Sequence, residues 1–154
     1  MEELPMKKIL VPVDGSEISL KAADQAVELA KKFGSEVTFI SVVERVVPFY
    51  GIGIGAPNIS EVEVETEIEK SKLTCYDGLL DFLIEKYKDS GLVLKSKTLQ
   101  GIIDEEIEDF AKDGQFDLIV MGRKGLSVAR RFFAGSTTRK IVDAGPCSVL
   151  IVKE

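Results

Sequence analysis

The sequence contains no histidine, and this absence excludes whole classes of chemistry. A hydrolase with a Ser–His–Asp triad needs an imidazole base, and imidazole is also the commonest metal ligand in proteins. The chain has only two cysteines, Cys75 and Cys147, and their separation matches no metal-binding spacing. Each falls in an apolar pattern, so we expect free, buried thiols without a disulfide. Such thiols are typical of a cytoplasmic protein.

Long apolar runs are also missing. No run approaches the roughly 20 residues that span a bilayer, so we expect no membrane partner. The first residues, Met1–Pro5, show no basic region followed by an apolar core, and we expect no secretory signal. A chain of 154 residues, 45% hydrophobic and 30% charged, is ordinary for one globular domain, and we expect residues 1–154 to form one.

Short apolar runs alternate along the chain with stretches whose apolar residues recur at helical spacing. The runs predict buried strands, and the stretches between them predict helices. This alternation predicts an α/β fold with a doubly wound, five-stranded parallel sheet and helices on both faces. The predicted strands are Lys7–Val13, Glu36–Val43, Leu92–Leu99, Phe116–Met121 and Cys147–Val152. The predicted helices follow Asp14-Gly15-Ser16 up to Gly34, span Val62–Tyr87 and Ile102–Ala111, and begin near Thr137. In the long helix we expect an inward face of Ile68, Leu73, Leu79, Leu80, Leu83 and Ile84.

In open parallel sheets, ligands bind beyond the carboxyl ends of the strands, where the strand order reverses. Asp14, Val42 and Gly122 each lie at the end of a predicted strand, so we expect them to border one crevice. A carboxylate at position 14 could accept hydrogen bonds from a ribose hydroxyl. Its spacing slightly favours the N-cap of the first helix, a role worth about 1 kcal/mol. The two roles do not exclude each other.

A glycine-punctuated loop follows the fourth predicted strand. Gly122-Arg123-Lys124-Gly125 is separated by nine residues from Gly135-Ser136, which directly precedes the last short helix. Glycines let backbone amides approach an anion closely. A helix start adds unpaired N–H groups and a partial positive charge. The loop therefore predicts a phosphate-binding site.

Charge points to the same segment. The chain carries a formal net charge of −6, yet residues 118–142 contain six basic residues and no Asp or Glu. The six are Arg123, Lys124, Arg130, Arg131, Arg139 and Lys140. A basic island on an acidic protein indicates a local anionic ligand, whereas a nucleic-acid surface usually makes the whole domain basic. We therefore expect no nucleic-acid partner.

Two other patterns favour ordinary structure over a site, and one well-known site pattern is missing. The glycines of Gly51–Gly55 resemble a dinucleotide fingerprint, but Pro57 and Asn58 intervene before a helix, which favours a flexible flap. The Walker pattern of the usual P-loop hydrolases is absent. The acids of Asp104–Asp109 alternate with apolar residues, as on the solvated face of a helix, so we expect no metal site there.

Taken together, these residues resemble the universal stress protein family over nearly the full length of the chain. The similarity lies in Lys7–Ser16, in Asp117–Gly122, in the Gly-x2-Gly-x9-Gly-Ser pattern and in Gly145–Val152. Within that family the glycine pattern marks the ATP-binding branch. The resemblance implies the strand order 3-2-1-4-5 of an adenine-nucleotide alpha-hydrolase-like fold, and a homodimer formed through the last strand.

The resemblance also implies a site for ATP. The backbone of Val42 would meet adenine, with Pro12 and Val13 alongside, and Asp14 and Gly122 would meet ribose. The phosphates, with which Mg²⁺ could bind, would be held by Gly125, Gly135, Ser136 and Thr137. Family members often have a small residue or a histidine after the first loop glycine, where this chain has Arg123 and Lys124. These cations either add phosphate contacts or shift the preference toward AMP or another nucleotide.

The function that we expect is that of an ATP-binding, homodimeric regulator of a stress response. The alternatives are a slow ATPase or nucleotide-transferring enzyme, a binder of AMP or ADP, and a scaffold that binds no nucleotide. Hydrolysis needs a base within reach of the attacking water. Asp14 is the only acid in the inferred crevice and is assigned to ribose, so we expect no catalytic residue. The sequence leaves open whether the chain also binds a protein partner.

Overall fold

The computed structural model describes residues 6–45, 59–123 and 136–154, with side chains from residue 66 onward in the second of these ranges. The elements are β1 Lys8–Pro12, α1 Glu17–Phe33, β2 Glu36–Glu44, α2 Ile59–Tyr87, the short 3-10 helix η1 Lys88–Ser90, β3 Leu94–Gly101, α3 Ile103–Asp113, β4 Leu118–Gly122, α4 Ser136–Ala144 and β5 Ser148–Val152. Each predicted strand and helix is present, with ends that shift by a few residues.

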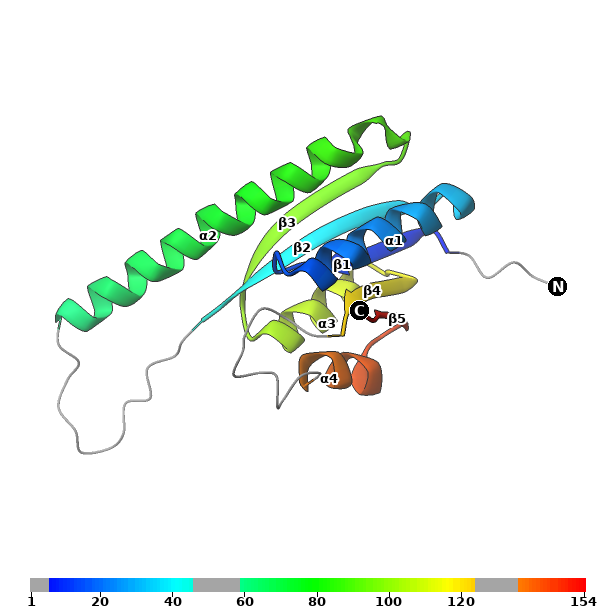
Figure 1. Cartoon of the computed structure of the whole chain (residues 1–154). Coiled ribbons are helices and arrows are strands. Elements are labelled where there is room, and N and C mark those ends of the chain that lie inside the picture. The colour runs from blue at the N-terminus through cyan, green and yellow to red at the C-terminus, as the bar shows by residue number, and fades with distance from the viewer. Residues whose placement is uncertain (1–5, 46–58, 124–135) are drawn as a thin grey trace.

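The five strands form one parallel sheet in the order β3-β2-β1-β4-β5. This confirms the predicted doubly wound fold and its strand order. Helices cover both faces, with α1 and α2 on one side and α3 and α4 on the other (Figure 1). The edges of the sheet are β3 and β5, and the central strand β1 lies between β2 and β4.

Two apolar cores follow from the alternation of side chains along the strands. On one face, Ile9 and Val11 of β1 pack against the alanines of α1, which are fully buried. On the other face, Leu10 of β1 packs with Ile107 of α3 and Ile141 of α4. Small alanine side chains let α1 lie close to the sheet. Gly34 ends this helix as predicted, in the left-handed conformation that glycine adopts without strain (φ 69°).

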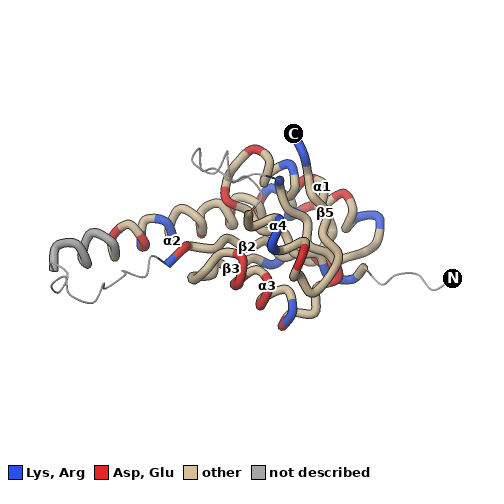
Figure 2. The backbone as a smooth tube through the Cα atoms, turned by 90° about the horizontal axis from the view of Figure 1, so that it is seen from below, with Lys and Arg blue, Asp and Glu red and all other residues tan. Residues whose placement is uncertain are grey.

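The N-terminal half of α2 corrects two expectations. Ile68, predicted to face inward, is 50% exposed, and Cys75, predicted to be buried, is exposed. A helix of 29 residues is about 43 Å long, whereas the eight residues of β3 span only about 26 Å. The start of α2 therefore extends past the carboxyl edge of the sheet (Figures 1 and 2). Only its second half, with Leu80 and Leu83, reaches the core.

The flap prediction for Gly51–Gly55 lies outside the described residues. Among the described residues, no helix is long and apolar enough to cross a membrane.

Candidate functional site

The candidate site lies at the carboxyl edge of the sheet, where the connections from β1 and β4 leave toward opposite sides. The chain leaves β1 through α1 to reach β2, while β4 pairs with the other edge of β1. This divergence is the switch point at which such sheets bind ligands. Of the predicted site residues, the structure brings Pro12, Val13, Asp14, Val42, Gly122, Arg123, Ser136 and Thr137 to this edge. Gly125 and Gly135 lie outside the described residues.

At the end of β1, the ladder to β2 stops while β2 itself continues. The last pair is Pro12 with Ile40, followed by one hydrogen bond from Val13 N–H to Ile40 O (2.8 Å). β2 runs on beside β3 as far as Glu44. Backbone groups of alternate residues point to the same side of a strand, so the N–H and C=O of Val42 point to the β1 side, as those of Ile40 do. They lie beyond the last pair of the ladder.

The turn after β1 tests one of the two roles considered for Asp14, that of the N-cap. The N-cap of α1 is Ser16, whose Oγ accepts a hydrogen bond from Ser19 N–H (3.2 Å). Asp14 Oδ1 instead accepts from the N–H of Ser16 (3.0 Å), which holds the turn. Gly15 allows this turn because its φ is +83°. The N-cap interpretation of Asp14 is therefore wrong, and its carboxylate is held by the turn that follows β1.

Gly122, the last residue of β4, lies against the first turn of α1. A Cβ at this position would lie 2.9 Å from Cγ2 of Ile18 and 3.1 Å from the Ile18 backbone carbon. The glycine is thus required for packing, whatever it contributes to a ligand. This contact joins two segments about a hundred residues apart, and no local pattern in the sequence indicates it.

The segment after Gly122 is tied to its neighbours by two contacts. Arg123 N–H donates to Val152 O at the end of β5 (2.9 Å). The hydroxyl of Thr138, in the first turn of α4, is 3.4 Å from Gly122 O and 3.5 Å from Arg123 O. Thr138 was not among the predicted site residues, although it directly follows Ser136 and Thr137. These contacts place the start of α4 beside the end of β4.

The start of α4 offers the donors that the sequence predicted. Ser136 is exposed and Thr137 half-buried in the first turn of this nine-residue helix. The first N–H groups of a helix have no partner within the helix and carry a partial positive charge. An anion bound at this edge of the sheet would accept hydrogen bonds from these N–H groups.

The basic island is weaker than its composition suggests. Lys140 forms an ion pair with Asp104 of α3 (2.8 Å), and this contact raises the pKa of the lysine. Arg139 lies 3.8 Å from Asp143 in the same helix. Charges of both signs accordingly occur on α3 and α4 (Figure 2). Arg123 is exposed at the edge of the sheet, and the other three cations of the island lie outside the described residues.

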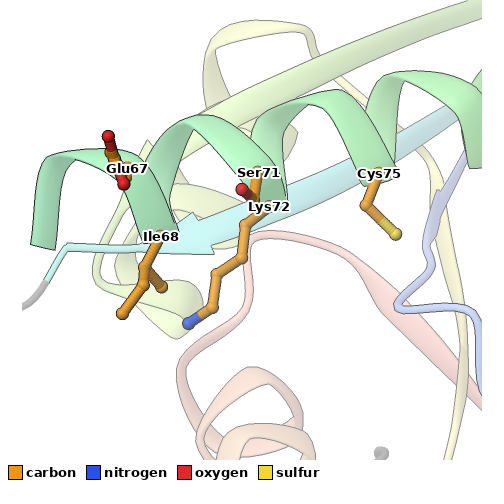
Figure 3. A pocket seen from close by; sticks show the side chains of 5 residues that line it. All are labelled: Glu67, Ile68, Ser71, Lys72 and Cys75. Carbon is orange, nitrogen blue, oxygen red and sulfur yellow. The ribbon is translucent and has the colours of Figure 1, made fainter. Parts of the chain in front are cut away.

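A hollow of about 400 Å³ lies along the projecting part of α2, with walls formed by Glu67, Ile68, Ser71, Lys72 and Cys75 (Figure 3). Ile68, Lys72 and Cys75 point to one side of the helix. One turn after Cys75, Leu79 lies 3.7 Å from the position of a Cβ on Gly15, in the turn that follows β1. Helix α2 therefore contacts the turn after β1, a contact that the sequence did not reveal.

Acidic clusters do not add a metal centre within the described ranges. No group of three or more Asp, Glu, His or Cys side chains there is arranged to hold a metal ion. The acids of α3 lie on a helix whose apolar residues, Ile107 among them, face the core, as the alternation predicted.

The fold defines a class of protein, the doubly wound parallel α/β proteins, in which ligands bind at the switch point of the sheet. Comparison with known proteins then gives the family. The model of the universal stress protein family matches residues 5–153. The chain belongs to the universal stress protein family.

Individual relatives agree with this assignment. A universal stress protein of Methanocaldococcus jannaschii is 34% identical over 148 residues, which cover 96% of this chain and 82% of the relative. The solved universal stress protein UspA from Lactobacillus plantarum is 28% identical, with a TM-score of 0.82 over 97% of this chain and 99% of that one.

Two more distant structures share the fold and contain a nucleotide. A universal stress protein in complex with cAMP is 19% identical, with a TM-score of 0.66 over 96% of this chain and 97% of that one. A universal stress protein family protein from Arabidopsis thaliana with AMP bound is 17% identical, with a TM-score of 0.65 over 96% and 92%.

Proposed function

We propose that this protein binds an adenine nucleotide, ATP in the first place, in the crevice at the carboxyl edge of the sheet. The observation that carries this proposal is the position of Val42, whose backbone N–H and C=O point toward β1 beyond the end of its ladder. An adjacent donor and acceptor match an edge of adenine, which presents an acceptor nitrogen beside an amino donor. The nucleotides bound to two structural relatives support the same ligand class.

In this proposal each of the remaining groups meets one part of the nucleotide. Pro12 and Val13 would lie beside the base, and the carboxylate of Asp14, held by the turn, would accept hydrogen bonds from ribose next to Gly122. The phosphates would meet the N-terminal end of α4. The proposed phosphate-binding residues are Arg123, Gly125, Gly135, Ser136 and Thr137. Mg²⁺ binds readily to nucleotide phosphates, so an Mg²⁺ ion bound to the phosphates would enter with the nucleotide.

We infer a regulatory role, in which bound nucleotide alters contacts with a partner, within a cytoplasmic stress response. The test begins with pure protein that has never been exposed to added nucleotide. Mass spectrometry of the small molecules released on denaturation should show an adenine nucleotide. Calorimetry with ATP, ADP, AMP, cAMP and GTP should then rank the ligands, with ATP the tightest and GTP the weakest.

The outcomes of this test separate the candidate functions. If none of the five nucleotides binds at millimolar concentration and none is released, the protein does not use this crevice for nucleotides and the proposal fails. If AMP or cAMP binds more tightly than ATP, the ligand class stands and the preference for ATP is wrong. Release of ADP and phosphate at many turnovers per protein would contradict the regulatory role.

We also propose that two copies associate through β5, which is an edge strand of the sheet. An edge strand presents unpaired backbone groups, and a symmetric contact between two copies would cover them. Val149, Leu150 and Ile151 are only half-buried in one copy. The wild-type protein should be a dimer in light scattering.

The variant Ile151→Lys should shift this dimer to monomer while nucleotide binding survives in part. The matched control is Ser96→Lys, which places the same charge at an exposed position on the other edge strand, β3. Circular dichroism should confirm that both variants are folded. Dissociation by the control alone, or a monomeric wild type at high concentration with and without ATP, would refute an interface at β5.

A further inference from the structure

At the end of the β1–β2 ladder, a side-chain hydroxyl donates a hydrogen bond where a backbone N–H would be expected to donate. In a parallel ladder, each residue donates its N–H to one residue of the neighbouring strand and accepts at its C=O from the residue two positions further on. Val13 donates its N–H to Ile40 O (2.8 Å). In an unbroken ladder, the carbonyl of Val13 would therefore accept from the N–H of Val42.

The carbonyl of Val13 accepts from a side chain instead. Its donor is the hydroxyl of Ser41, at 2.8 Å. Ser41 is only 1% exposed and stands between apolar, buried neighbours on β2. A hydroxyl in such surroundings is costly unless it is hydrogen-bonded, and this bond provides the partner. The side chain of Ser41 thus bonds to the same carbonyl that the backbone N–H of Val42 would meet in an unbroken ladder.

We propose that Ser41 is a positioning residue that ends the ladder one bond early and keeps the backbone N–H of Val42 available to the base of the nucleotide. The inference rests on the proposed nucleotide-binding function. It deepens that function because it concerns selection of the base. The edge of adenine with N7 and N6 offers an acceptor beside a donor, whereas guanine offers two acceptors there. A free N–H and C=O on one residue therefore favour adenine, and loss of the N–H to the ladder removes this preference.

The chain offers a matched control at the opposite edge of the sheet. Ser35 is 2% exposed and directly precedes β2, and its hydroxyl donates to Met6 O, just before β1 (2.5 Å). The chemistry is the same, a buried serine hydroxyl on a carbonyl of the β1 segment. The location is at the amino edge, away from the crevice. Ser35→Ala should lower stability as Ser41→Ala does and should leave nucleotide binding unchanged.

The experiment compares wild type, Ser41→Ala, Ser41→Thr and Ser35→Ala in ATP and GTP calorimetry, and measures hydrogen exchange of the Val42 amide by NMR without nucleotide. In Ser41→Ala the ladder can extend by the bond from Val42 N–H to Val13 O. We expect its ATP affinity to fall on the order of tenfold, its ATP-to-GTP preference to narrow, and the Val42 amide to exchange more slowly. Ser41→Thr keeps the hydroxyl and should restore the wild-type preference.

Each result has one meaning. If wild type binds ATP, and Ser41→Ala is folded but keeps both its affinity and its base preference, Ser41 has no positioning role. If Ser41→Ala and Ser35→Ala weaken ATP equally, the effect is one of stability and the inference is wrong. If Ser41→Ala does not fold, the test rests on Ser41→Thr, in which hydrogen exchange of the Val42 amide and the ATP-to-GTP preference are measured. A loss of that preference in Ser41→Thr overturns the inference. A wild type that binds no nucleotide overturns the proposed function, and this inference with it.

Discussion

The close approach of Gly122 to α1 gives a sharp test of the structure. In the variant Gly122→Ala, the new Cβ would lie 2.9 Å from Cγ2 of Ile18 and 3.1 Å from the backbone carbon of the same residue. Ile18 is only 7% exposed and belongs to the core between α1 and the sheet, so it has little room to move. Overpacking of this kind typically costs about 1–3 kcal/mol.

The assay is urea denaturation of the nucleotide-free protein, followed by a thermal melt. A loss of 1 kcal/mol lowers the melting temperature of a domain of this size by about 2–4 °C. The control is Gly78→Ala, at an exposed position in α2 where an added Cβ meets no atom within 4 Å. This control should be more stable than wild type by about 1 kcal/mol, since alanine favours a helix interior over glycine.

A double-mutant cycle tests whether Ile18 is the cause. Ile18→Ala alone should cost about 2–5 kcal/mol, because it leaves a cavity in the core. The double variant should lose less unfolding free energy than the two single variants lose together, by about 0.5 kcal/mol or more, because the truncated side chain makes room for the new methyl group. If Gly122→Ala keeps the stability of wild type, the packing argument is refuted and only a role in nucleotide approach remains for the glycine.

Three further predictions follow from the described contacts. Asp14→Asn retains an oxygen that can hold the turn, so it should keep the melting temperature of wild type and lower the affinity for ATP in calorimetry. Asp14→Ala should lower both the melting temperature and the affinity, and an unchanged ATP affinity in both variants would exclude a ribose contact. Burial and the hydrogen bond from the Tyr87 hydroxyl to Asp24 raise the pKa of the tyrosine. Burial raises the pKa of Asp24, but the hydrogen bonds from Tyr87 and Lys86 outweigh it and lower that pKa below its ordinary value of 3.8. The stabilisation that this carboxylate provides is therefore present above pH 3.8 and is lost on acidification. Tyr87→Phe should thus cost about 0.5–1 kcal/mol at pH 7 in urea denaturation, and a cost that does not shrink in acid would contradict this pairing. Cys147, predicted to be buried, is only half-buried; partial burial and the nearby carboxylate of Asp117 still raise the pKa of its thiol. Iodoacetamide should therefore label exposed Cys75 first in mass spectrometry, and equal rates would contradict this difference in exposure.

The sequence was sufficient to predict the layers of the fold and to bring the candidate site residues to one edge of the sheet. Buried parallel strands are continuous apolar runs, so Lys7–Val13 and Phe116–Met121 were recognisable from composition alone. Gly34 marked the end of α1, because a left-handed cap favours glycine at that point. Once strands and helices alternate, the carboxyl ends of the strands must share one edge, and Asp14 and Gly122 had to lie there.

Other features depend on contacts between distant segments, and only the tertiary structure decided them. Asp14 and Ser16 are both good N-caps with similar energies, and the geometry of the turn selected Ser16. The apolar spacing of α2 continues through Ile68, but the sheet ends before the helix does. A periodic pattern shows which face of a helix is apolar and does not show how far its partner extends.

The same reason applies to the two packing details at the crevice. The serine within the apolar run Glu36–Val43 is visible in the sequence, but its bond to the carbonyl of Val13 requires the register of β1 against β2. The contact of Gly122 with Ile18 likewise depends on how closely α1 approaches the end of β4. Local preferences act over a few residues and specify elements, whereas hydrogen-bond competition and steric contact act through space between segments that only folding brings together.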